Sequence, residues 1–115
     1  MPRDAASLAD LLDAARTILS HAVGVSEAEF RTSPVLQDAV LYRINVIGEA
    51  ARRLSEDFRA HHPEIPWRDI IAMRNRVVHE YESVDPAKVW VVIERDIPEL
   101  IGQIEPLLLP PPPAP

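Results

Sequence analysis

Apolar residues recur at helical spacing along most of the chain. Residues 4–22 carry them three or four positions apart, with charged side chains between, which predicts an amphipathic helix that ends near Gly24. A longer stripe runs from Ser33 to about residue 59 and consists of Leu36, Val40, Ile44, Ile47, Ala51, Leu54 and Phe58. Because a strand cannot keep that period, we expect one long helix there, with Ser33 as its N-cap and Pro34 as its first residue.

Three further helical segments are expected from their caps and prolines. Ser26 and Glu29 have the spacing of a capping box and predict a short helix or an ordered turn. The prolines of "HHPEIPW" separate the long helix from another that runs from Trp67 to near Glu82. A last helix follows, and Pro98 is expected to bend or interrupt it.

The long helix also has polar residues beside its apolar stripe. Tyr42, Asn45 and Glu49 share that adjoining face. They could meet a neighbouring helix, line a site or lie in solvent, and the pattern leaves all three open.

These elements predict an all-α protein, an up-and-down bundle of four helices with an extra short helix. The bundle is expected over residues 1–109, and a disordered proline-rich tail over 110–115. Neither an internal repeat nor a second domain is evident. Helices this apolar, with an exposed tryptophan or valine expected on the last one, suggest a dimer that buries a further face.

Composition narrows the functional classes. The chain has no cysteine, which excludes thiol catalysis and thiolate metal sites and is compatible with a cytoplasmic protein. No apolar run approaches the roughly 18–20 residues that span a bilayer, so a soluble protein is expected. A net charge of −6 argues against sequence-independent coating of nucleic acid, yet residues 43–76 hold seven arginines against five acids, a local balance of +2.

Potential chemistry concentrates in residues 74–81, "RNRVVHEY". At about 100° per residue, Asn75 and His79 share one helical face and Arg74 and Tyr81 another. Arg74 and His79 then diverge by roughly 140°. They could meet if the helix is irregular there, or if a second protomer supplies the opposite wall of a groove.

This residue set suits cleavage of RNA. His79 can act as acid or base near neutral pH, Arg74 can hold a phosphate by two parallel hydrogen bonds, and Asn75 can orient either group. A metal site at His61, His62 and His79 is disfavoured, because adjacent histidines rarely share one ion. A solvated helix surface is the alternative interpretation of the whole cluster.

Three blocks of the chain, "YRINVIGEAARRLS", "HPEIPWRDIIAMRNRVVHEY" and "VWVVIERDIPEL", resemble in order and spacing the HepT-like toxins of the HEPN superfamily. The signature is an arginine, a polar residue, a few further residues and then His-x-Tyr. Glu80 departs from it, since many relatives have a glycine between the histidine and the tyrosine.

The resemblance implies a homodimer in which two motifs line one cleft and act as a metal-independent endoribonuclease, with no cofactor. Arg74 and His79 match the catalytic pair, and Asn75 matches its polar companion. It also implies a MntA-like nucleotidyltransferase antitoxin that transfers AMP from ATP to Tyr81 and so neutralises the toxin. The alternative is a non-catalytic helical partner that only binds and is modified by such an enzyme.

Overall fold

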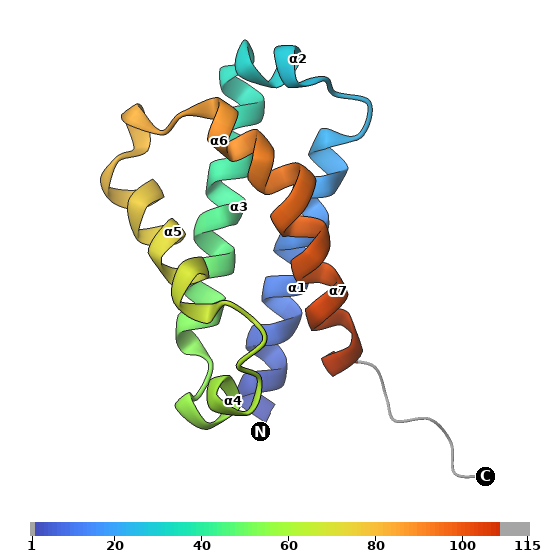
Figure 1. Cartoon of the computed structure of the whole chain (residues 1–115), viewed down its shortest axis with the longest axis vertical. Helices are drawn as coiled ribbons and strands as arrows, with labels where there is room; N and C mark the ends of the chain where they lie inside the picture. Colours follow the sequence, from blue (N-terminus) through green and yellow to red (C-terminus); the bar gives the residue numbers. More distant parts are fainter. Residues whose placement is uncertain (1, 109–115) are drawn as a thin grey trace, which may run out of the picture.

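Residues 2–108 are described by a computed structural model, and within that range the regular structure is helical, without strands (Figure 1). The predicted all-α class is confirmed, whereas the proposed tail lies outside the described residues. The elements are α1 (Pro2–Ala22), α2 (Glu27–Arg31), α3 (Pro34–Arg53), α4 (Glu56–His61), α5 (Trp67–His79), the 3₁₀ turn η1 (Tyr81–Ser83), α6 (Pro86–Val91), the π-helical η2 (Val92–Asp96) and α7 (Ile97–Leu108).

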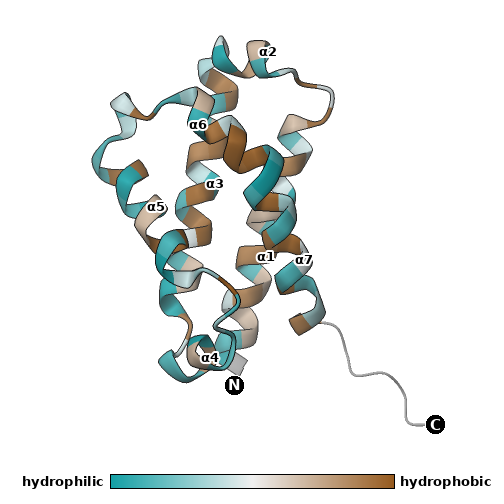
Figure 2. Ribbon diagram, in the orientation of Figure 1, coloured by the Kyte–Doolittle hydropathy of each residue, from teal (hydrophilic) through white to brown (hydrophobic). Residues whose placement is uncertain are grey.

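Helix α3 occupies the middle of an up-and-down bundle. It packs against α1 on one side and α5 on the other, while α7 returns along α1 (Figure 1). The continuous run α6–η2–α7 serves as the fourth long helix. Apolar residues concentrate along α3 and this run, whereas α4 and α5 are more hydrophilic (Figure 2).

The core is filled by the apolar stripes that the sequence pattern identifies. Leu11, Ala15 and Ile18 of α1 are fully buried, as are Ala50 and Ala51 of α3. Of the tryptophan or valine expected to be exposed on the last helix, the tryptophan is buried, because the ring of Trp90 packs 5.5 Å from that of Phe30 in α2 and the residue is only 7% exposed. Its neighbour Val91 is the exposed valine.

The long helix ends earlier than expected. Instead of continuing to about residue 59, α3 ends at Arg53, and Leu54 adopts an extended conformation. Ser55 then caps α4, and Asp4 of α1 accepts hydrogen bonds from both the backbone N–H and the hydroxyl of Ser55, each at 2.8 Å. The first of these bonds satisfies the backbone N–H that an uninterrupted helix would have used, and together they stabilise the break.

The two serine caps behave as expected elsewhere. Ser26 and Ser33 accept from the backbone N–H groups three residues later, at 3.1 and 3.2 Å, and so cap α2 and α3. Pro98, which was expected to bend or interrupt the last helix, is the second residue of α7, and the run α6–η2–α7 continues through it, with the π-helical turn η2 ending at Asp96. A proline removes a backbone donor and crowds the preceding carbonyls, and a widened turn accommodates both effects.

Candidate active site on the seam between α3 and α5

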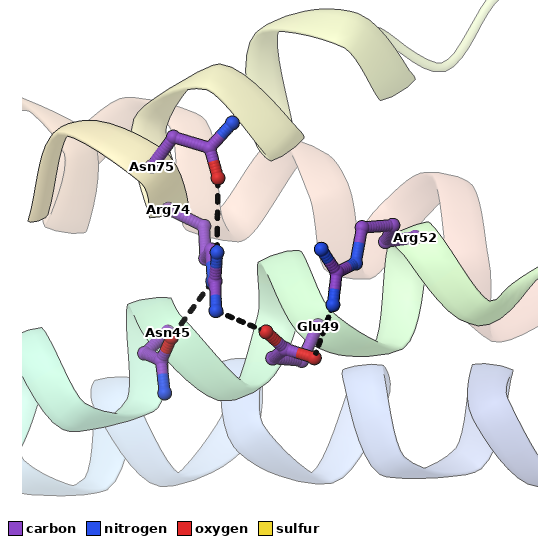
Figure 3. Close-up of polar contacts among 5 residues, drawn as sticks. All are labelled: Asn45, Glu49, Arg52, Arg74 and Asn75. Atoms are coloured by element: carbon purple, nitrogen blue, oxygen red, sulfur yellow. Dashed lines mark hydrogen bonds and ion pairs between the residues drawn. The ribbon is translucent and has the colours of Figure 1, made fainter. Parts of the chain in front are cut away.

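The side chain of Arg74 lies against α3 and is held there by three polar groups (Figure 3). Its Nε donates to Oδ1 of Asn45 at 3.0 Å, Nη1 donates to Oδ1 of Asn75 at 3.0 Å, and Nη2 forms an ion pair with Glu49. Only 19% of the arginine side chain is exposed. The guanidinium therefore has a fixed orientation, with each of its nitrogens engaged.

Gly48 makes room for that arginine. A Cβ atom at this position would approach the Cβ and Cγ atoms of Arg74 more closely than 3.0 Å, a separation that real Cβ atoms essentially never show. Glycine inside a helix costs roughly 0.5–1 kcal/mol relative to alanine, so its presence in α3 reflects the close approach of α5.

Glu49 is shared between two arginines. Its second carboxylate oxygen lies 3.4 Å from Nη2 of Arg52, one turn further along α3 (Figure 3). Two guanidinium groups therefore surround one carboxylate. Glu49, Arg52 and Arg74 together keep a net charge of +1, which attracts a phosphodiester more strongly than a neutral pair of Glu49 and one arginine would.

Tyr81 follows α5 in the turn η1 and is also attached to α3. Its hydroxyl donates a hydrogen bond to the carboxylate of Asp38. That bond, followed by loss of hydration and the negative charge of Asp38, raises the pKa of Tyr81 above its ordinary value. The side chain is still 45% exposed, so the phenol is anchored and accessible at once.

One face of α3 supplies the partners that Arg74 and Tyr81 have across the seam, and we call these residues, Asp38, Asn45 and Glu49, the polar stripe. The three lie seven and four residues apart, so they share one side of the helix. Because α3 and α5 run antiparallel, the later residues of the stripe meet Arg74 and the earlier one meets Tyr81 (Figure 1). The polar face that the sequence left open thus points, at Asn45 and Glu49, to a neighbouring helix.

The motif histidine is placed differently. His79 is the last residue of α5 and is exposed, and within residues 2–108 its side chain makes no hydrogen bond or ion pair. Asn75 is also exposed and turns its carbonyl oxygen to Arg74. In the single chain, therefore, Arg74 faces α3 while His79 faces solvent, and the two predicted catalytic groups are not brought together.

Glu80, which stands where many relatives of the motif have glycine, fits its backbone without strain. It is the C-cap of α5 with φ −127°, a conformation open to any residue. Its side chain borders a cavity of about 360 Å³ between α5 and α6, where Arg76 and Lys88 also lie. Two cations and two carboxylates, Glu80 and Asp85, therefore surround that cavity.

Residues 2–108 contain neither a candidate metal site nor a candidate membrane-spanning helix. No three histidine, aspartate or glutamate side chains of that range gather closely enough to hold a metal ion. Among the same residues, every helix is too short or too polar to cross a membrane.

Comparison with known proteins places the chain in a family. The family model described as Ribonuclease HepT-like matches residues 11–107. A protein of Thermococcus cleftensis named "Probable ribonuclease HepT" is 35% identical over 87% of this chain and 91% of its own length. A protein of Caldanaerobacter subterraneus named "Putative RNase" is 34% identical over 88% and 90%, respectively.

A further relative, from Methanocaldococcus jannaschii and also named "Putative RNase", is 29% identical over 87% of this chain and 92% of its own. No solved structure matches the chain significantly. The matched range contains the polar stripe and the whole motif, from α3 to η1. By its sequence and its all-α bundle, the chain belongs to the HepT-like ribonuclease family.

Proposed function

We propose that this protein is the toxin of a toxin–antitoxin pair and cleaves RNA without a metal ion. The observation that carries the proposal is the fixed orientation of Arg74, held on the polar stripe five residues before an exposed histidine. An arginine held in this way costs little further entropy when a phosphate binds, and the free imidazole is available for proton transfer.

In this reaction the ribose 2′-oxygen attacks the adjacent phosphorus, and the bond from phosphorus to the 5′-oxygen breaks. An imidazole of His79 takes the 2′-hydroxyl proton, and a protonated imidazole returns one to the leaving 5′-oxygen. Each such transfer contributes about 10²- to 10⁴-fold. Arg74 stabilises the extra negative charge that develops on the phosphoryl oxygens.

A homodimer supplies the arrangement that one protomer lacks. Arg74 points to α3 and His79 to solvent, so a groove containing both needs a second copy of α5 opposite the first. Two symmetry-related motifs would also provide two imidazoles, one as base and one as acid.

The antitoxin in this proposal is a MntA-like nucleotidyltransferase that transfers AMP from ATP to Tyr81. The exposed phenol is accessible to such an enzyme. The added phosphodiester places bulk and negative charge two residues from His79. Both disfavour RNA binding, the bulk by steric exclusion and the charge by repulsion of the RNA phosphates.

A second function is supported by the ion pair between Arg74 and Glu49. A guanidinium already neutralised by a carboxylate has less attraction for phosphate. In that case the chain is a non-catalytic partner of the nucleotidyltransferase, modified on Tyr81 and inactive on RNA.

The test is cleavage of labelled RNA by purified protein in the presence of EDTA, together with growth arrest on expression. We expect the parent to cleave and His79→Ala and Arg74→Ala to lose at least about 10²-fold in rate. His61→Ala removes an exposed imidazole from α4 and is the matched control, with parental activity expected.

Thermal melting of each variant separates loss of chemistry from loss of fold. Equal cleavage by the parent and both motif variants would contradict the ribonuclease assignment. Absence of cleavage by every protein, with AMP found on Tyr81 after co-expression, would support the second function instead.

A further inference from the structure

The hydrogen bond between Tyr81 and Asp38 joins two groups that are 43 residues apart in the sequence. Asp38 belongs to the second turn of α3, and Tyr81 lies in the turn after α5. Both side chains are exposed, so the bond contributes little to the core. Its geometry nevertheless gives the phenolic proton one defined acceptor.

We propose that Asp38 is the general base for nucleotidyl transfer to Tyr81, an inference that rests on the proposed function. The phenolic oxygen of Tyr81 attacks the α-phosphorus of ATP, and the bond from that phosphorus to the oxygen bridging to the β-phosphate breaks. Pyrophosphate leaves, and the phenolic proton passes to the carboxylate of Asp38. The products are a tyrosyl–AMP phosphodiester, pyrophosphate and a protonated Asp38, which then releases its proton to water.

A base is needed because phenol is a poor nucleophile at neutral pH. With an ordinary pKa near 10, only about one tyrosine in 10³ is ionised at pH 7. Contact with Asp38 makes spontaneous ionisation rarer still, because it raises the pKa of Tyr81. The same contact becomes productive once the oxygen begins to bond to phosphorus, since the proton is then acidic and its acceptor is already in place.

The neighbouring acids do not offer this geometry. Glu80 and Glu82 flank Tyr81 in sequence, yet among residues 2–108 the only hydrogen bond of the phenol is to Asp38. Asp38 is also the one ionisable group in that range that contributes to the raised pKa of Tyr81. The fold, rather than the local sequence, therefore supplies the base.

The experiment measures transfer of labelled AMP from ATP to the intact protein by a MntA-like nucleotidyltransferase from the same genome, under single-turnover conditions across pH 6–10. Asp38→Asn keeps an oxygen that accepts from the phenol but cannot take its proton. Glu82→Gln removes a negative charge beside Tyr81 and is the matched control. Tyr81→Phe defines the background.

We expect Asp38→Asn to react about 10²- to 10⁴-fold more slowly at neutral pH, with a rate that rises with pH as the phenolate forms. Glu82→Gln should react within about twofold of the parent, and the parental rate should depend little on pH between 7 and 9. Melting curves and binding of the nucleotidyltransferase should match the parent for both variants.

Two failures are distinguishable. If the parent is labelled but Asp38→Asn reacts at the parental rate with the parental pH profile, Asp38 is not the base, although the modification stands. If the parent is not labelled, or Tyr81→Phe is labelled equally, the proposed modification of Tyr81 is itself wrong, and this inference is overturned with it.

Discussion

Tyr81 shows how a contact between single residues changes the chemistry of the motif. In a Tyr42→Phe background Tyr81 is the only tyrosine, since the chain has two. Ultraviolet titration of phenolate should then give a pKa above the ordinary value of about 10. Adding Asp38→Asn should lower it, because the carboxylate that favours the neutral phenol is gone.

The sign of the linked stability follows from the same contact. Because the fold raises the pKa of Tyr81, the contact stabilises the folded state fully at pH values below the ordinary tyrosine pKa. This contribution is lost as the pH rises through the higher pKa of the folded state. If the Tyr42→Phe protein gave the same phenolate titration with and without Asp38→Asn, the hydrogen bond between Tyr81 and Asp38 would not persist in solution.

The motif residues are visible in the sequence, whereas their partners on α3 are harder to find. Arg74, Asn75, His79 and Tyr81 stand out as polar groups close together in the chain, but the contact between Asp38 and Tyr81 was not expected. The sequence contained a signal for this contact, because Asp38 lies two helical turns before Asn45 and so on the same face of the helix as Asn45 and Glu49. Periodicity gives the direction of a side chain around its own helix, but not which neighbouring helix it meets.

At the scale of helices, Gly48 should be more important for packing than for flexibility. Gly48→Ala should destabilise the fold by about 1–3 kcal/mol, because the new methyl group overlaps Arg74 and pushes α5 from α3. Gly102→Ala in α7 is the matched control: a Cβ there meets nothing within 4 Å, so better helix propensity should stabilise by up to about 1 kcal/mol.

Urea unfolding of both variants measures the difference, and amide chemical shifts of Arg74 report the displacement of α5. Equal stabilisation by the two alanines would mean that the helices separate at no cost. The close approach would then not explain why glycine is present in α3.

Helix boundaries were predicted less well than helices. The apolar stripe continues through Leu54 and Phe58, so periodicity alone extends α3 past its true end at Arg53. The break depends on Asp4, which is 51 residues away from Ser55 and accepts two of its hydrogen bonds. A bond between residues so distant in sequence has no signature in the local pattern.

At the scale of the whole molecule, the proposed cleft predicts complementation between subunits. Arg74→Ala and His79→Ala should each be inactive alone, but co-expressed and purified together they should recover part of the RNA cleavage, because one of the two His79 imidazoles of the proposed cleft is still missing. Random pairing makes about half of the dimers mixed, and each mixed dimer retains one intact Arg74 and one intact His79. Cleavage rates of the mixture and of the separate variants measure the recovery.

Sedimentation analysis must accompany that measurement. A protein that cleaves RNA as a monomer, or a mixture no more active than its components, would contradict a cleft shared by two protomers. Recovery of activity would explain why Arg74 and His79 can serve one reaction although they face different directions in the single chain.

The attachment of the motif to α3 also determines what could be transplanted. Grafting "RNRVVHEY" alone onto a helix of another bundle would deliver an arginine without a counter-charge and a tyrosine without an acceptor. The smallest portable unit is discontinuous, an antiparallel pair made of residues 38–52 and 74–81, with the glycine that lets them touch. A transplanted signature without residues 38–52 of α3 would keep the motif residues but lose the contacts that orient Arg74 and Tyr81.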